Sequence, residues 1–168
     1  MIPMKIYMAS RFKTYKELNE IADRLVKQGH KIVSTWHKVE ATPGYNATMP
    51  PPAKGPERDA RSMFVAERDL EEILGADAIL LYTHECDLTP GGMWVEMGFA
   101  MALNKRVFIY GPRTNVFCHR AQLVDFNEQG ELTVVEDMEH YYTVLTERNK
   151  LLAEYYQTKK SLTPAAAL

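Results

Sequence analysis

The sequence predicts an α/β protein with an open, mostly parallel five-stranded sheet that carries helices on both faces. Short apolar runs rich in β-branched residues alternate with segments of helical periodicity, which is the pattern of βαβ units. The chain has 168 residues, 46% of them hydrophobic, and this size suits one domain with a sizeable core. We therefore expect a single domain over residues 1–158, followed by a flexible tail at 159–168.

The first half of the chain contains two expected strands and a helix. Residues 6–9 form the first strand, and residues 15–28 form a helix whose apolar side chains share one face, with Gly29 ending it. Residues 31–36 form the second strand. The segment 37–56 is rich in Pro and Gly and too long for an ordinary connection, which is typical of a functional lid or a disordered segment.

The second half continues the alternation. Residues 57–74 are expected to form a helix with an apolar stripe, which ends at Gly75. Residues 92–104 are expected to form a helix that is apolar almost all round. Further strands are expected at 78–82, 106–110 and 132–135, and a last helix at 138–157. A Rossmann-like sheet of this kind binds ligands outside the carboxyl ends of its strands. Those ends carry Ser10, Arg11, Trp36, His37, residues 84–92 and residues 111–115.

The composition excludes several classes of protein. Lys and Arg number 20 against 22 Asp and Glu, and the net charge of −2 excludes a strongly electrostatic nucleic-acid or membrane binder. Two cysteines, Cys86 and Cys118, cannot form a disulfide framework or a four-thiolate zinc site. No apolar stretch approaches a membrane span, and Lys5 interrupts the start before a secretion signal can develop. We expect a cytoplasmic protein.

One carboxylate stands in the otherwise uncharged helix 92–104. Burying Glu96 alone would cost several kcal/mol without compensation. Glu96 lies within about two turns of the helix start, where free N–H groups and the helix dipole favour an anion. We interpret it as a functional group, with a buried salt bridge to Arg or Lys, or a capping role, as the structural alternative.

Asp69 is the second candidate, because it flanks the apolar stripe of residues 57–74. Glu67 flanks the opposite edge of the stripe equally well, so periodicity does not choose between them. A solvated carboxylate at the rim is the structural alternative for either.

A buried carboxylate at the mouth of such a sheet can attack the anomeric carbon of a sugar while a second carboxyl protonates the leaving group. It can also act as a general base or accept a hydrogen bond from a ribose hydroxyl. No G-x-G-x-x-G follows the first strand, and no Walker A loop, G-x-S-x-G or HExxH is present. We therefore expect neither a metal nor an organic cofactor.

Three stretches resemble a known family. They are KIYMASRF, AERDLEEILGADAILLY and GGMWVEMGFAMALNKRVFIYG, and together they cover somewhat under half of the chain. They resemble the nucleoside 2-deoxyribosyltransferases and the related 2′-deoxynucleoside 5′-phosphate N-hydrolases. The resemblance implies cleavage of the N-glycosidic bond of a 2′-deoxynucleoside or its 5′-monophosphate, with transfer of the sugar to another nucleobase or to water. It also implies a homodimer or a higher homo-oligomer.

The resemblance assigns roles to individual residues. Glu96 falls on the family nucleophile, which attacks C1′ of the deoxyribose and forms a covalent glycosyl-enzyme. Asp69 falls on the carboxylate that gives a proton to the departing base, and Tyr7 on the tyrosine that orients the nucleophile. His37 resembles a pocket histidine of the hydrolases, and Trp36 beside it is placed to stack on a base. Core packing is the structural alternative for Tyr7 and Trp36.

A substrate phosphate has a natural anion site at Ser10, Arg11 and the backbone N–H groups after the first strand. A solvated surface charge is the alternative for Arg11. The Pro-rich segment 37–56 is the candidate lid that would exclude water and so favour transfer over hydrolysis.

The loop before Glu96 departs from the family pattern. Pro90 stands where both branches place a polar residue, and Trp94 stands where they tend to have Gly. These changes bear on the identity of the substrate more than on the class of reaction. The substrate-binding residues expected in this loop are Asp87, Thr89, Gly91 and Gly92.

Two other functions stay open. T-P-G-G followed by a helical Glu is similar to the P-G-G-x-G-T-x-x-E signature of Lonely-Guy-type phosphoribohydrolases, although Trp94 replaces a Gly and the glutamate stands one position early. The other is a nucleotide-binding sensor that keeps the fold and Glu96 without turnover.

Overall fold

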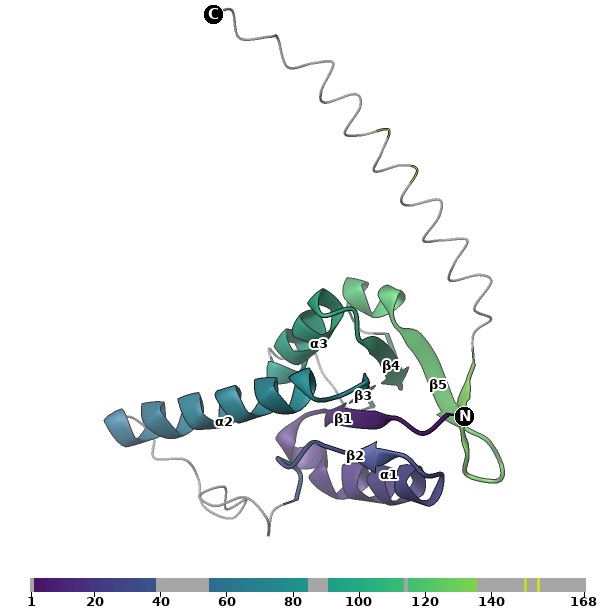
Figure 1. The fold of residues 1–168 in the computed structure, drawn as a ribbon, viewed down its shortest axis with the longest axis horizontal. Coiled ribbons are helices and arrows are strands. Elements are labelled where there is room, and N and C mark those ends of the chain that lie inside the picture. The colour runs from purple at the N-terminus through teal and green to yellow at the C-terminus, as the bar shows by residue number, and fades with distance from the viewer. Residues whose placement is uncertain are drawn as a thin grey trace, which may run out of the picture. The chain divides into compact units, whose positions relative to one another are not determined.

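Figure 1 shows the computed structural model, which describes residues 2–38, 55–84, 91–113 and 115–135, together with Lys150 and Glu154. The chain divides into two units, Met1–Val135 and Glu136–Leu168. In the second unit Lys150 and Glu154 are helical. The rest of the helix expected at 138–157, the tail expected at 159–168 and most of the 37–56 segment lie outside the described residues. The single domain over 1–158 therefore stays a prediction.

The first unit is built on a six-stranded sheet in the order β2-β1-β3-β4-β5-β6. Strands β1 to β5 run parallel, and β6 runs antiparallel to β5. The strands are β1 (Lys5–Ala9), β2 (Lys31–Ile32), β3 (Ala78–Tyr82), β4 (Arg106–Tyr110), β5 (Gln122–Phe126) and β6 (Leu132–Val134). The prediction of an α/β protein with a mostly parallel sheet is confirmed.

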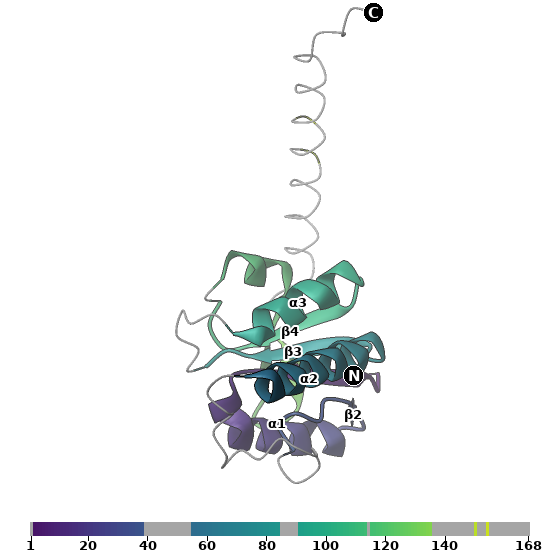
Figure 2. The same ribbon diagram turned by 90° about the vertical axis from the view of Figure 1, so that its left-hand side faces the viewer.

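Helices cover both faces of this sheet, as predicted. Figures 1 and 2 show α1 (Tyr15–Lys27) on one face and α2 (Pro56–Leu74) with α3 (Gly92–Ala102) on the other. Short 3₁₀ helices, η1 (Phe12–Thr14) and η2 (Val116–Arg120), precede α1 and β5. None of the helices in the described part of the chain is long and apolar enough to cross a membrane.

The sequence pattern predicts five strands, and the described residues form six. The additional strand is β5, whose sequence QLVDF mixes polar and apolar residues too irregularly to be recognised as a strand. The strand predicted at 31–36 is also shorter than expected. The backbone N–H of Val33 still donates to Ile6 O at 2.9 Å, but the chain then turns at Trp36, whose indole N–H donates to Met8 O at 2.7 Å.

The core lies along the two central strands. The side chains of β1 from Ile6 to Ala9 and of β3 from Ala78 to Leu81 are fully buried. Because helices cover both faces, these strands are continuous apolar runs rather than alternating ones. Helix α1 buries the stripe formed by Leu18, Ile21, Ala22 and Leu25.

A side-chain amide joins the end of α1 to the last pair of strands. Gln28 Nε2 donates to Gly130 O at 2.8 Å, and Gln28 Oε1 accepts from the backbone N–H of Leu132 at 3.0 Å. One turn earlier the guanidinium of Arg24 lies over the ring of Phe126, 5.4 Å from its centroid. These contacts fasten the β5–β6 hairpin to the first helix.

Gly111, directly after β4, has a backbone conformation and surroundings that exclude a side chain. Its φ is +123°, and a Cβ there would lie 2.6 Å from Thr83 Oγ1 and 2.7 Å from the backbone nitrogen of His84. We expect Gly111→Ala to lower the free energy of unfolding by about 1–3 kcal/mol, measured by urea unfolding. Gly98→Ala is the matched control, because no described atom lies within 4 Å of a Cβ there and alanine favours a helix interior by roughly 0.5–1 kcal/mol. Equal effects of the two changes would contradict the steric argument.

Candidate active site

The carboxylate of Glu96 lies where α3 packs against the central strand β1. Met93, Met97 and Ala100 of α3 are buried against the sheet, and Glu96 borders this face of the helix. The hydroxyl of Tyr7 in β1 donates a hydrogen bond to Glu96 Oε1 at 2.9 Å. Because Tyr7 is fully buried in the middle of the sheet, the phenol gives the carboxylate a fixed partner.

This environment changes the protonation of both groups. Burial raises the pKa of Glu96 to about 7, the charges of Asp69 and Glu72 add to the rise, and the hydrogen bond from Tyr7 opposes it. Burial, followed by the charge of Glu96, also raises the pKa of Tyr7 well above its ordinary value. Tyr7 therefore keeps its proton and remains a hydrogen-bond donor, while Glu96 changes its charge near neutral pH.

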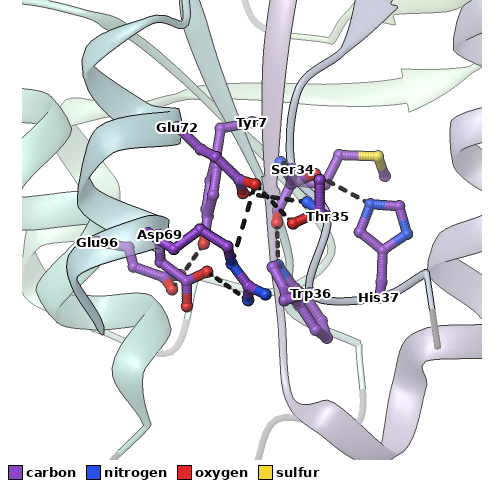
Figure 3. Close-up of polar contacts among 10 residues, drawn as sticks. Tyr7, Ser34, Thr35, Trp36, His37, Asp69, Glu72 and Glu96 are labelled. Carbon is purple, nitrogen blue, oxygen red and sulfur yellow. Dashed lines mark hydrogen bonds and ion pairs between the residues drawn. The ribbon is translucent and has the colours of Figure 1, made fainter. Parts of the chain in front are cut away.

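Asp69 reaches the same place from α2. Its side chain is 13% exposed, and Arg68 Nη2 donates to Asp69 Oδ1 at 3.0 Å. Burial raises the pKa of Asp69, and the hydrogen bond and charge of Arg68 oppose this rise. Figure 3 shows the carboxyl groups of Asp69 and Glu96 next to each other. Glu67, which periodicity could not separate from Asp69, is exposed.

Glu72 is a third carboxylate of the site, and the sequence pattern did not single it out. It accepts hydrogen bonds from the backbone N–H of Thr35 at 3.0 Å and from Thr35 Oγ1 at 2.6 Å (Figure 3). Its spacing of three residues from Asp69 places both on one face of α2, and its spacing of four from Arg68 favours an ion pair. That spacing was the available signal. No pattern in the sequence indicated that Thr35 would bond to Glu72, because this contact depends on how the chain turns after β2.

Trp36 and His37 are engaged with the protein interior. Trp36 is 7% exposed, and its indole N–H donates a hydrogen bond to Met8 O. His37 is fully buried, with Nε2 3.0 Å from Ser34 Oγ and Nδ1 2.7 Å from Asn19 Oδ1. Burial, with a smaller effect of the Lys38 charge, lowers the pKa of His37 to about 4, so its ring is neutral near pH 7. In Figure 3 the His37 ring lies apart from the two catalytic candidates Asp69 and Glu96.

Ser10 and Arg11 lie at the carboxyl end of β1, as predicted. Ser10 Oγ donates to Tyr82 O at 2.8 Å and lies 2.7 Å from Thr14 Oγ1, which ties the ends of β1 and β3 together. The side chain of Arg11 is partly exposed. Thr14 Oγ1 donates to Arg11 O at 2.7 Å, so this short turn is held by its own side chains.

The loop before α3 is described only at its end. Asp87 and Thr89 lie outside the described residues. Gly91 is the N-cap of α3 in an extended conformation, and Gly92 is the first helical residue. No described atom lies within 4 Å of a Cβ placed on either glycine, so the helix start near Glu96 is open on that side as far as the structure describes it.

The structure thus brings together Tyr7, Asp69 and Glu96, three residues separated by up to 89 positions in the sequence. It adds Arg68 and Glu72 to them. Among the described residues, no group of three or more His, Cys, Asp or Glu side chains is placed to hold a metal ion. The arrangement offers one buried carboxyl that titrates near pH 7, a second beside it, and a fixed hydroxyl donor.

This fold is an α/β fold with a mostly parallel sheet, and its candidate site holds two neighbouring, largely buried carboxyl groups, Asp69 and Glu96. A family model described as nucleoside 2-deoxyribosyltransferase matches residues 6–150. The chain belongs to the nucleoside 2-deoxyribosyltransferase family and is therefore a glycosyl-transferring enzyme.

A solved structure is similar in fold. It is a 2-deoxyribosyltransferase from the psychrotolerant bacterium Bacillus psychrosaccharolyticus, with a TM-score of 0.52 and 23% sequence identity. The match covers 74% of this chain and 85% of that chain. At this identity the likeness shows a shared fold. A comparison with curated proteins found no match.

The raised pKa of Glu96 makes stability depend on pH. Between pH 4.5, the ordinary value, and about 7, the folded protein holds a proton that the unfolded chain releases, so Glu96 destabilises the fold increasingly as the pH rises. We expect Glu96→Gln to raise the free energy of unfolding by roughly 2 kcal/mol more at pH 8 than at pH 5, measured by urea unfolding. The exposed Glu71→Gln should show no such difference. An equal gain from Glu96→Gln at both pH values would contradict the raised pKa.

Proposed function

We propose that the protein breaks the N-glycosidic bond of a 2′-deoxynucleoside or its 5′-monophosphate, with Glu96 taking the sugar as a covalent intermediate. The observation that carries the proposal is the hydrogen bond from buried Tyr7 to Glu96, beside a second carboxyl, that of Asp69, whose side chain is only 13% exposed. Retaining glycosidic chemistry requires such a pair. Membership of the nucleoside 2-deoxyribosyltransferase family supports a deoxyribosyl substrate over the phosphoribosyl alternative.

In the first step the ionised carboxylate of Glu96 attacks C1′ while the bond from C1′ to the base nitrogen breaks. Positive charge develops on C1′ and the ring oxygen in the transition state, and a carboxylate held out of water stabilises it strongly. Asp69 in its protonated form gives a proton to the departing base, which leaves neutral. A 2′-hydroxyl would withdraw electron density from the developing cation, so a 2′-deoxy sugar reacts more easily.

In the second step a nitrogen of the acceptor base attacks C1′ of the glycosyl-enzyme and releases Glu96. The carboxylate of Asp69 takes the proton that the acceptor nitrogen loses, which restores both groups to their starting forms. Water in place of the acceptor base gives hydrolysis. Tyr7 acts in both steps by holding one oxygen of Glu96, so that the other oxygen faces C1′.

A 5′-phosphate on the substrate has a candidate site at the end of β1. Ser10 lies there between β1 and β3, and Arg11 follows it with a partly exposed side chain. Backbone N–H groups and a guanidinium together are suited to bind a phosphate. The assay below compares nucleosides with their 5′-monophosphates for this reason.

Removing either carboxyl should separate their roles. With a panel of 2′-deoxynucleosides, 5′-monophosphates and ribonucleosides, followed by chromatography of the free base with and without an acceptor base, we expect Glu96→Ala to abolish base release. We expect Asp69→Asn to slow it by about 10²–10⁴-fold, because only proton transfer is lost. Glu71→Gln, on the same helix and exposed, should keep full activity.

Two outcomes of this assay would contradict the proposal. Tight binding of nucleotides without base release by the wild-type protein would indicate a sensor. A preference for ribonucleotides would favour a phosphoribohydrolase.

The hydrogen bond from Tyr7 should be visible in the pH profile. It lowers the pKa of Glu96, so Tyr7→Phe should move the acidic limb of the kcat/KM profile to higher pH than in the wild-type protein. The rate at the optimum should fall about tenfold or more, because a hydrogen bond to a charged group is worth about 1.5–3 kcal/mol. An acidic limb that stays in place would show that Glu96 is not the group that must ionise.

A further inference from the structure

Arg68 lies between two carboxylates and bonds fully to only one of them. Its Nη2 donates to Asp69 Oδ1 at 3.0 Å, whereas its Nε lies 4.0 Å from Glu72 Oε1. Nε is buried, and no hydrogen-bond acceptor among the described residues pairs with it. A buried N–H without a partner is unfavourable, so a small movement of the guanidinium toward Glu72 would satisfy it.

Glu72 is the fixed member of this group. Both of its oxygens accept hydrogen bonds from Thr35, at 2.6 and 3.0 Å, and these contacts connect α2 to the segment that follows β2. The side chains of Glu72 and Arg68 are 14% and 17% exposed, so water screens their charges only partly. Of the two partners it is therefore Arg68, with its long side chain, that is able to shift.

The charged and titratable groups that face Asp69 come from three elements. They are Arg68 and Glu72 from α2, Glu96 from α3 and Tyr7 from β1. Arg68 lowers the pKa of Asp69 and Glu72 raises it. The two neighbours on α2 therefore act on Asp69 in opposite directions.

We propose that Arg68 is a positioning residue shared between the two carboxylates: it pairs with Asp69 when Asp69 is ionised, and it moves toward Glu72 when Asp69 takes a proton. This inference rests on the proposed function, in which Asp69 alternates between these two forms. The acceptor base gives a proton to Asp69, Arg68 moves to Glu72, and the pair reforms when Asp69 passes the proton to the next departing base. Asp69 becomes neutral in the same step in which Glu96 is released from the sugar as a carboxylate, so the net charge of the four side chains is unchanged.

Two substitutions should move the titration of Asp69 in opposite directions. Without its positive neighbour in Arg68→Gln, Asp69 should hold its proton to higher pH. Without the negative charge in Glu72→Gln, it should lose its proton at lower pH. The direct readout is the ¹³C carboxyl titration of Asp69, assigned with Asp69→Asn, and Glu71→Gln is the control. Arg68→Lys keeps the charge and should restore the midpoint toward the wild-type value.

The kinetic readout is the pH profile of kcat. The limb that reports Asp69 should move to higher pH in Arg68→Gln and to lower pH in Glu72→Gln, with kcat reduced several-fold and KM nearly unchanged, because neither residue is proposed to touch the substrate. Shifts in the same direction, or shifts equal to those of Glu71→Gln, would overturn the proposal. If the wild-type protein releases no base, the proposed function fails, and the carboxyl titration still decides whether Arg68 and Glu72 oppose each other at Asp69.

The movement itself is tested by a crystal structure of Asp69→Asn, which imitates the neutral form. We expect Arg68 Nε to lie within about 3 Å of Glu72 Oε1 in that variant, which is hydrogen-bond distance. An Arg68 that keeps its original position, with Nε unpaired, would overturn the movement.

Discussion

The hydrogen bond from Tyr7 to Glu96 joins the middle of the sheet to the helix that covers it, and the rest of the site is arranged around this contact. A carboxylate in an apolar helix would be costly without such a partner. Because the donor comes from a fully buried residue of a central strand, neither group can move far from the other. The same burial that makes the carboxylate costly raises its pKa to about 7, where an acid and its conjugate base are both available. Burial of Glu96 therefore both destabilises the fold and brings its pKa into the range that acid–base chemistry needs.

The neighbours of this contact limit how much negative charge the site accumulates. Three carboxyl groups, Asp69, Glu72 and Glu96, lie near one another with Arg68 among them. Each has a different partner. Glu96 accepts a hydrogen bond from the neutral hydroxyl of Tyr7, Asp69 pairs with the cation of Arg68, and Glu72 accepts two hydrogen bonds from Thr35. The negative charges of Asp69 and Glu72 make it harder for Glu96 to lose its proton, and so they raise its pKa further. The cation of Arg68 and the hydrogen-bond donors of Tyr7 and Thr35 therefore offset part of the negative charge that the three carboxyl groups bring together.

Much of the fold and the centre of the site could be predicted from the sequence, for physical reasons that particular residues illustrate. A charged residue, Glu96, stands in an otherwise apolar helix, and such a local conflict made it a candidate for the site, where the structure places it beside Tyr7 and Asp69. Periodicity predicts that Asp69 and Glu67 flank the apolar stripe equally well. Which of the two faces the site depends on where α3 packs against α2. Strand β5 went unrecognised because its pairing with β4 and β6, rather than its own pattern, defines it. Thr35 could not be connected to Glu72, since that contact depends on β2 ending at Ile32, four residues before the end of the predicted strand 31–36.

The amide of Gln28 has a consequence for how the chain reaches this structure. It bonds to two residues more than a hundred positions away, Gly130 in the turn of the β5–β6 hairpin and Leu132 at the start of β6. Closing so long a loop costs entropy that local contacts do not repay. The contacts of Gln28 can therefore form only after residues 130–132 have left the ribosome, so α1 gains its link to the β5–β6 hairpin late in synthesis.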